Sequence, residues 1–201
     1  MSQFPILFSS IFLPILGALF IFFYKSKSKS FDKDVFYFGI FFALCNLIIS
    51  IYALSIFDKE SMRFQFVEFI QISQHLKLNY LVGVDGLSLL MIFLTNLLIP
   101  ICFFISIGKI KLRVKGYVSS FLVLQALIIG SFAALDIILF YICFEAILIP
   151  MFIIIGIWGG KDRIYAALKF FLYTLAGSLF FLIAIIYIVT KYKTSNIIDL
   201  Q

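Results

Sequence analysis

Long apolar runs separated by short polar segments make up most of this chain. A helix that crosses the hydrocarbon layer of a bilayer, roughly 30 Å thick, needs about 20 mostly apolar residues. Six runs reach that length, so the pattern predicts an all-α integral membrane protein with a single membrane domain. We expect the transmembrane helices at about residues 4–24, 35–57, 84–108, 117–135, 137–158 and 165–190.

The longest polar segment, residues 58–82, separates the second predicted span from the third. Residues 63–68 and 76–80 within it alternate between apolar and polar side chains, a period of two that is typical of β-strands. We therefore expect a small exposed hairpin in this loop.

Two aspartates stand where predicted helices begin. Asp85 precedes Ser88 by three residues at the start of the third span, and Asp136 opens the fifth. Side-chain carboxylates at such positions accept hydrogen bonds from the free N–H groups of the first turn. We expect structural roles for both, as helix caps.

Pro150 lies inside the fifth predicted span. Proline has no N–H, so the carbonyl of Ala146 loses its helical partner there. The freed carbonyl, one residue from Glu145, offers a place for water, which would suit proton transfer. The alternative is a plain bend, because proline is common in membrane helices.

Composition and charge fit this picture. Hydrophobic residues make up 64% of the chain and charged residues 13%, and the net charge is +6. Because the basic residues lie in short loops between spans, they indicate membrane orientation and lipid contact rather than nucleic-acid binding. The loops at 25–34, 109–116 and 159–165 hold ten Lys and Arg, against five in the 58–82 loop and the tail. The positive-inside rule places the first group on the cytoplasmic or matrix side and residues 58–82 outside.

Metal and nucleotide chemistry find no support in the sequence. The cysteines, Cys45, Cys102 and Cys143, lie far apart in apolar runs, and His75 is the only histidine. Zinc, haem and iron–sulfur sites need clustered ligands, and phosphate-binding loops need glycine-rich motifs that do not occur here. We expect no cofactor and no metal on this chain.

Glu145 is the candidate functional residue. Nine residues after Asp136 and thirteen before Trp158, it lies near the middle of the fifth predicted span. A carboxylate at that depth costs about 3 kcal/mol on insertion scales, so such residues are usually retained for a function. Proton transfer is the use we expect. The alternative is a protonated carboxyl group that only hydrogen-bonds a neighbouring carbonyl.

Lys169 lies about one turn inside the sixth predicted span. Its long side chain can extend to the membrane interface, or it can act as a buried cation that relays protons or tunes a carboxylate. Thr174, Gly177 and Ser178 follow on the same helix and form a small seam suited to close helix packing.

Two stretches of the chain resemble a known family. The sequence Phe140-Tyr-Ile-Cys-Phe-Glu145-Ala-Ile-Leu-Ile-Pro-Met, continuing to Trp158-Gly-Gly, is similar to subunit 4 (chain M) of respiratory complex I. So are Arg163-Ile-Tyr-Ala-Ala-Leu-Lys169-Phe-Phe-Leu-Tyr-Thr174 and, earlier, Gly83-Val-Asp85-Gly-Leu-Ser-Leu. The resemblance covers essentially the whole chain, which corresponds to the N-terminal portion of an antiporter-like subunit.

That resemblance implies a proton-translocating membrane subunit of NADH:quinone oxidoreductase. Glu145 matches the family's fifth-helix glutamate, which carries protons, and Lys169 matches a sixth-helix lysine that relays or tunes. NADH, FMN, iron–sulfur clusters and quinone belong elsewhere in the complex. The implied location is the mitochondrial inner membrane or the bacterial cytoplasmic membrane.

Full-length members of the family continue beyond the sixth helix and carry a lysine on the seventh that pairs with the glutamate. Neither is present in these 201 residues. The expected partners are therefore neighbouring antiporter-like subunits and a separate chain that carries the missing C-terminal helices. Such a second chain would come from a split gene. The alternative explanation is that this chain is a truncated product. Two alternatives stay open: a cation/proton antiporter or hydrogenase membrane subunit, and a structural half-subunit that conducts nothing.

Overall fold

A computed structural model describes residues 5–25, 31–61, 63–73 and 78–200. Six helices in it are long and apolar enough to cross a membrane. They are α1 (Ile6–Phe23), α2 (Phe31–Ile56), α3 (Gly86–Ser106), α4 (Val114–Ala133), α5 (Ile137–Trp158) and α6 (Arg163–Tyr192). A short helix, α7 (Ile197–Leu200), follows α6. The predicted six-span, all-α membrane fold is confirmed.

The helix boundaries differ from the predicted spans at charged ends. Helices α2, α4 and α6 begin two to four residues earlier than predicted, because their first turns hold polar residues that hydropathy assigns to loops. Arg113, the N-cap of α4, has a left-handed backbone with φ of 51°. Helix α3 begins two residues later than expected, because residues up to Val84 belong to a strand.

A β-hairpin occupies the polar segment between α2 and α3. Strand β1 (Gln65–Ser73) pairs antiparallel with β2 (Leu78–Val84), and both extend beyond the predicted alternating stretches. The register shifts twice along β1, the first time near Phe66, whose φ is 52°. The turn at 74–77, with His75, lies outside the described residues.

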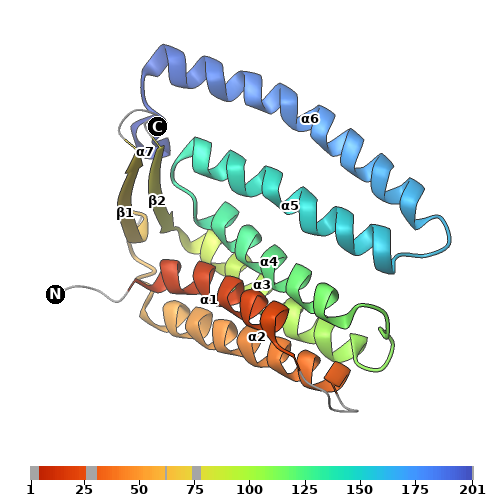
Figure 1. The fold of residues 1–201 in the computed structure, drawn as a ribbon. Helices are drawn as coiled ribbons and strands as arrows, with labels where there is room; N and C mark the ends of the chain where they lie inside the picture. Colours follow the sequence, from red (N-terminus) through yellow and green to blue (C-terminus); the bar gives the residue numbers. More distant parts are fainter. Residues whose placement is uncertain (1–4, 26–30, 62, 74–77, 201) are drawn as a thin grey trace.

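Figure 1 shows the helices lying side by side, with the hairpin across one end of the bundle. Helix α1 begins and α7 ends at this hairpin end, whereas α1, α3 and α5 end, and α2, α4 and α6 begin, at the opposite end. The segments that join these helices, at 25–34, 109–116 and 159–165, together hold ten Lys and Arg, and their described residues lie at this one end of the molecule.

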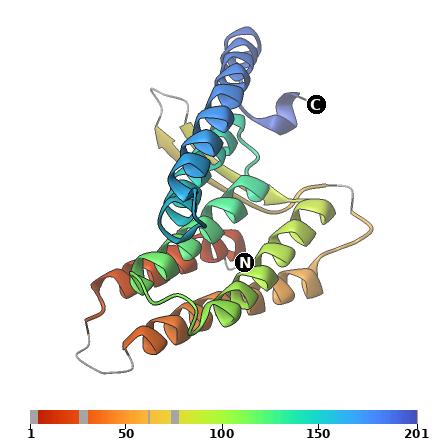
Figure 2. The same cartoon turned by 90° about the vertical axis from the view of Figure 1, so that its right-hand side faces the viewer.

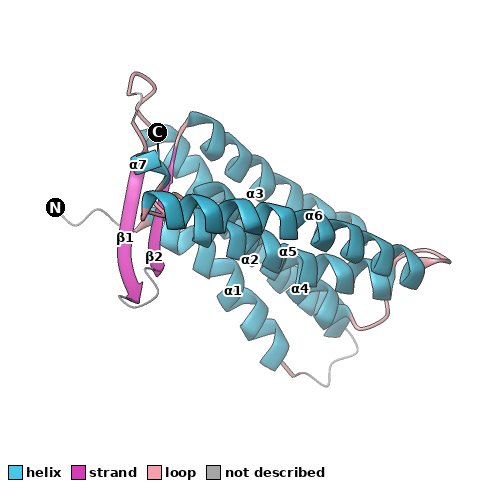
Figure 3. Ribbon diagram, turned by 90° about the horizontal axis from the view of Figure 1, so that it is seen from above, coloured by secondary structure: helices cyan, strands magenta, loops and turns pink. Residues whose placement is uncertain are grey.

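Helices α1 to α4 form a compact group, whereas α5 and α6 extend from one side of it (Figure 2). Helix α5 packs on α4, and α6 packs on α5. Viewed from above, the six helices run roughly alongside one another, and the hairpin stands at their end (Figure 3). Only 11% of the apolar window of α5 or α6 is buried, against 33–50% for the other four.

Two apolar clusters fill the four-helix group. The one nearer the basic loops includes Phe36, Phe103 and Val118, and the one nearer the hairpin includes Leu7 and Ile92. Helices α2 and α4 approach so closely that a Cβ on Gly39 would lie 2.3 Å from Cγ1 of Val118. Gly39 thus allows a helix contact that a larger residue would block.

A layer of polar side chains connects all four helices. In each helix its polar residue lies, in sequence, between the residues of the two apolar clusters. Ser10 Oγ donates to Asn46 Oδ1 at 2.8 Å, and Asn46 Nδ2 donates back to the Ser10 carbonyl at 2.9 Å. Gln125 Nε2 donates to Asn96 Oδ1 at 2.7 Å, and Asn96 Nδ2 reaches the Asn46 carbonyl at 3.4 Å. All four residues are buried, but Gln125 Oε1 has no hydrogen-bond partner within the described part of the chain.

Candidate functional site

Glu145 lies on α5, eight residues after Ile137, where the helix begins. Because each residue adds about 1.5 Å, Glu145 is about 12 Å along the helix axis from Ile137. The side chain is partly buried. Its Oε1 atom is fully covered, yet no described residue hydrogen-bonds it. A covered carboxyl oxygen without a donor is costly, so this site is chemically incomplete in the described chain.

Tyr141 lies one helical turn before Glu145. Residues four apart on a helix lie on the same face, so the Tyr141 and Glu145 side chains are neighbours. The Tyr141 ring packs against Phe181, with ring centroids 6.2 Å apart. Ser178 is buried, and its Oγ lies 2.9 Å from the Leu175 carbonyl, to which it donates. The face of α5 that carries Glu145 therefore contacts α6 through the Tyr141 ring.

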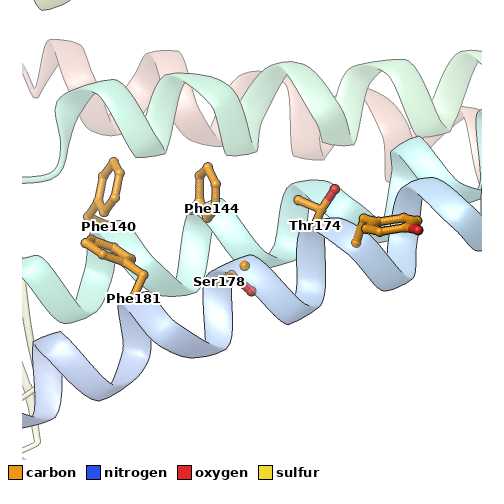
Figure 4. Close-up of a pocket in the computed structure, with 7 residues that line it drawn as sticks. Phe140, Phe144, Thr174, Ser178 and Phe181 are labelled. Carbon is orange, nitrogen blue, oxygen red and sulfur yellow. The ribbon is translucent and has the colours of Figure 1, made fainter.

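A groove of about 470 Å³ runs between α5 and α6 beside these residues. Figure 4 shows Phe140 and Phe144 on α5 and Thr174, Ser178 and Phe181 on α6, with the Phe140 and Phe181 rings close together. The complete lining is Phe140, Phe144, Tyr173, Thr174, Gly177, Ser178 and Phe181. The polar seam predicted on the sixth helix thus lies at this groove, with an aromatic wall opposite.

Lys169 lies away from this site. Ala167 faces α5, where Gly156 lies within van der Waals distance, and Lys169 is two residues further, about 200° around the helix. Its Nζ lies 5.7 Å from the Tyr165 ring centroid and 5.9 Å from that of Tyr173, cation–π contacts on an exposed face. Within the described ranges no carboxylate forms an ion pair with Lys169. The structure does not bring Lys169 and Glu145 together.

Asp136 lies at the N-cap of α5. Its Oδ1 accepts from the N–H groups of Ile138 and Leu139 at 2.9 and 3.0 Å. Its Oδ2 accepts from the Ser195 hydroxyl at 2.5 Å, which ties the segment after α6 to the start of α5. Pro150 is buried within α5, which continues through it to Trp158. Both residues shape the helix that carries Glu145.

Asp85 lies at the N-cap of α3 in a capping box with Ser88. Its Oδ1 accepts from the Ser88 hydroxyl at 2.6 Å and from the Ser88 N–H at 2.8 Å. These hydrogen bonds hold the pKa of Asp85 below its ordinary value, and the one from the Ser88 hydroxyl has the larger effect. Its contacts are those of a helix cap.

Glu68 is a residue whose role the sequence analysis missed. From β1 its two carboxylate oxygens accept from the Leu7 and Phe8 N–H groups at the start of α1, each at 2.9 Å. At the other end of α1, the Lys115 ammonium of α4 donates to the Tyr24 carbonyl. An acidic side chain thus lies at the N-terminal end of α1 and a basic side chain at its C-terminal end, which is the arrangement that the helix dipole favours.

Burial raises the pKa of the Glu68 carboxyl group, although hydrogen bonds from Phe8 and Leu7 oppose that rise. Because the pKa of Glu68 is higher in the folded chain than in the unfolded chain, proton binding at Glu68 stabilises the fold. This contribution is complete below about pH 4.5, the ordinary pKa of a glutamate, and is lost as the pH rises through the raised pKa. Glu68→Gln keeps an acceptor oxygen but does not titrate. We expect it to flatten the fall of the thermal midpoint as the pH rises above about 4.5.

The measurement is thermal unfolding in mild detergent, with Glu60→Gln as the control, since Glu60 is exposed in the same polar segment. Parallel pH profiles for Glu68→Gln and the unchanged protein would contradict this account of Glu68.

Within the described ranges, no group of three His, Cys, Asp or Glu residues could hold a metal ion. Cys45, Cys102 and Cys143 are partly buried on three different helices, α2, α3 and α5. This donor set does not fit an iron–sulfur cluster, which is held by several clustered cysteines.

Comparison with known proteins places this geometry in context. A family model described as "NADH:quinone oxidoreductase/Mrp antiporter, TM" matches residues 134–201. NADH-quinone oxidoreductase subunit M of Rickettsia conorii is 45% identical over 193 residues, 95% of this chain and 39% of that protein. NADH-ubiquinone oxidoreductase chain 4 of Marchantia polymorpha is 38% identical over 93% of this chain and 37% of its own length.

Solved structures share the fold. A chain of respiratory complex I from Thermus thermophilus superposes with a TM-score of 0.80 at 22% identity, over 96% of this chain and 38% of that one. A chain of an archaeal membrane-bound sulfane sulfur reductase gives a TM-score of 0.77 at 18% identity. With six apolar helices and these relatives, the chain is a multi-pass membrane protein. It spans about two fifths of the length of the curated relatives it matches.

Proposed function

Because this chain belongs to the family of NADH-quinone oxidoreductase subunit M and chain 4, we propose that it is a proton-translocating membrane part of an NADH:quinone oxidoreductase. The observation that carries the proposal is Glu145: a carboxyl group deep in a spanning helix, with a covered oxygen that lacks a donor. Such a group can bind a proton from one side of the membrane and release it to the other.

In this proposal Glu145 holds the moving proton, and its neighbours control access. The Phe140 and Phe144 rings form the apolar wall of the groove, while Thr174 and Ser178 line the other side. A largely dry site strengthens the coupling between the proton on Glu145 and nearby charges. Lys169, on the exposed face of α6, would tune or relay protons only through a group that covers that face.

Other polypeptides complete the site in this proposal. Helices α5 and α6 expose most of their surface, and the relatives are more than twice as long as this chain. We place a separate chain carrying the remaining helices, together with neighbouring antiporter-like subunits, over α5 and α6. Lipid contacts the outward faces of α1 to α3. In this proposal, electron transfer among NADH, FMN, iron–sulfur clusters and quinone takes place on other subunits.

A second candidate is a cation/proton antiporter subunit, since the matching family model covers both kinds of protein. Membrane vesicles distinguish the two: sodium-dependent proton movement without NADH would favour the antiporter. A structural half-subunit without conduction is the third reading, and a functional Glu145 would exclude it.

The experiment that tests the proposed assembly is extraction of native membranes in mild detergent, followed by mass spectrometry of the proteins that comigrate with this chain. We expect a very large assembly that contains other oxidoreductase subunits and a chain with the missing helices. Recovery of the chain alone, or as a small homo-oligomer, would contradict the proposal.

A further inference from the structure

Helices α5 and α6 are joined at both of their ends, although only one of the joints is covalent. A short turn links them at the end opposite the hairpin. At the hairpin end, where α7 lies (Figure 1), the chain after α6 pairs antiparallel with the residues that open α5. The Ile137 N–H donates to the Ser195 carbonyl, and the Ile197 N–H donates to the Leu135 carbonyl, both at 2.9 Å. Residues 195–197, the return segment, therefore close the helix pair into a loop.

The return segment also extends the hairpin sheet. The Leu135 N–H donates to the Leu81 carbonyl of β2 at 2.9 Å, and Ala134 pairs antiparallel with Val82 of the same strand. Residues 134–136, which link α4 to α5, thus lie between β2 and the return segment, hydrogen-bonded to both. The start of α5 is therefore held from two sides.

Asp136 fastens the return segment to the helix itself. Its side chain is only 1% exposed. Oδ1 accepts from the Ile138 and Leu139 N–H groups, and Oδ2 accepts from the buried Ser195 hydroxyl. These three donors and the positive end of the α5 dipole take the place of water around the carboxylate. A helix cap needs only one side-chain oxygen, so the second oxygen serves the contact with the return segment.

We propose that Asp136 is a positioning residue: with Ser195 as its partner, it locks the start of α5 to the return segment and so holds Glu145 at its working depth. Glu145 lies nine residues, about 13.5 Å, further along the same helix. Any slide or rotation at the start of α5 therefore moves its carboxyl group. Side-chain packing restrains α5 weakly in the described chain, where 11% of its apolar window is buried. The inference rests on the proposed function and goes beyond it, since it makes the return segment a control point for the proton site.

Ser195→Ala separates the lock from the helix cap, because it removes the hydroxyl donor and leaves the other hydrogen bonds of Asp136 in place. The first readout is residue-resolved hydrogen exchange in the assembled complex. We expect about tenfold faster exchange at the Ile137 and Ile197 amides, the order of change for a lost hydrogen bond to a charged group. The two capped amides of the first turn should keep their rates. If Asp136 only capped α5, Ser195→Ala would leave all four rates unchanged.

Proton pumping by the same complex is the second readout. Since a 1 Å misplacement of a reacting group can cost about 100-fold in rate, partial release of α5 should slow pumping about fivefold. Ser195→Thr keeps a hydroxyl group and should restore both readouts. Thr194→Ala is the matched control, because the Thr194 hydroxyl bonds with Asp199 and the Asn196 N–H, both in the chain after α6. That variant should pump like the unchanged complex.

Unchanged exchange at Ile137 and Ile197 in Ser195→Ala, or full-rate pumping by this variant, would overturn the positioning role. Equal slowing by Thr194→Ala would also overturn it, since the effect would then belong to local order after α6. If Ser195→Ala assembles poorly, Ser195→Cys replaces it. The thiol is a weaker donor of similar size, so it should change both readouts in the same direction by less.

Failure of the lock differs from failure of the proposed function. If Glu145→Gln pumps normally, the proton-carrying role of Glu145 is wrong, whatever the Ser195 variants do. If Glu145→Gln is inactive and Ser195→Ala behaves like the unchanged protein in both readouts, only the role of Asp136 and Ser195 is wrong.

Discussion

Glu145→Gln is expected to abolish NADH-driven proton pumping while the complex still assembles. Glutamine has nearly the shape of glutamate, so the packing of α5 on α4 and α6 should persist. It cannot bind and release a proton at neutral pH. Since a positioned acid or base typically contributes 10²–10⁴-fold to a proton-transfer step, the rate through this site should fall by at least about 100-fold.

The measurement is the initial rate of vesicle acidification by the assembled complex, divided by the rate of NADH oxidation. Glu68→Gln is the matched control, because it changes a second partly buried glutamate at the hairpin end. That variant should pump normally. A Glu145→Gln complex that assembles and acidifies vesicles at the unchanged rate would remove Glu145 from the proton pathway.

The second large effect is expected in the polar layer of the four-helix group. Asn96→Leu removes the acceptor of Gln125 Nε2, and Gln125 Oε1 already has no described partner. The whole Gln125 amide is then buried without a hydrogen bond. Because each buried unsatisfied group costs about 1–3 kcal/mol, Asn96→Leu should destabilise the bundle by roughly 2 kcal/mol or more.

Gln125→Leu should cost less, although it affects the same contact. It removes the amide oxygen that lacks a partner and leaves only the Asn96 oxygen unpaired. The Asn96→Leu/Gln125→Leu double variant should recover part of the loss, since two apolar side chains can replace a hydrogen-bonded pair at little cost. Thermal unfolding in detergent ranks the three variants. Equal losses for the two single variants would show that packing, rather than hydrogen bonding, sets their stability.

The spans and the depth of Glu145 were predictable because both depend on local composition. Twenty apolar residues have few alternatives to a membrane helix, and the rise per residue then fixes the depth of a carboxylate. The capping position of Asp85 depends on Ser88 three residues away, so the same local logic applied. The ends of the hairpin strands were not predictable in this way, since a register shift near Phe66 interrupts the alternation of apolar and polar residues.

The surroundings of Glu145 were not predictable in the same way. Tyr141 was visible as a neighbour one turn away, but its contact with Phe181 arises only from the α5–α6 register. That register depends on packing and on the Gly159–Asp162 turn, which sequence spacing does not specify. The exposed position of Lys169 follows from which face of α6 meets α5, and the hydropathy of α6 does not reveal that face.

The partners of the buried polar residues and of Glu68 could not be predicted from the sequence either. Asn96 is buried, as a polar residue inside a span should be, yet its partners come from α2 and α4. Glu68 lies sixty residues beyond the N–H groups of α1 that it binds. Polar pairs that join distant segments leave no periodic signal in the sequence.

The two charged contacts of α1 also have a consequence for biogenesis. The N–H groups at the start of α1 can bind Glu68 only after β1 has been synthesised, and the Tyr24 carbonyl can accept from Lys115 only 91 residues after it has itself been made. At a synthesis rate of about 5–20 residues per second, the delay is roughly 5 to 20 seconds. Helix α1 therefore has side-chain partners at both of its ends only after α4 has begun to form.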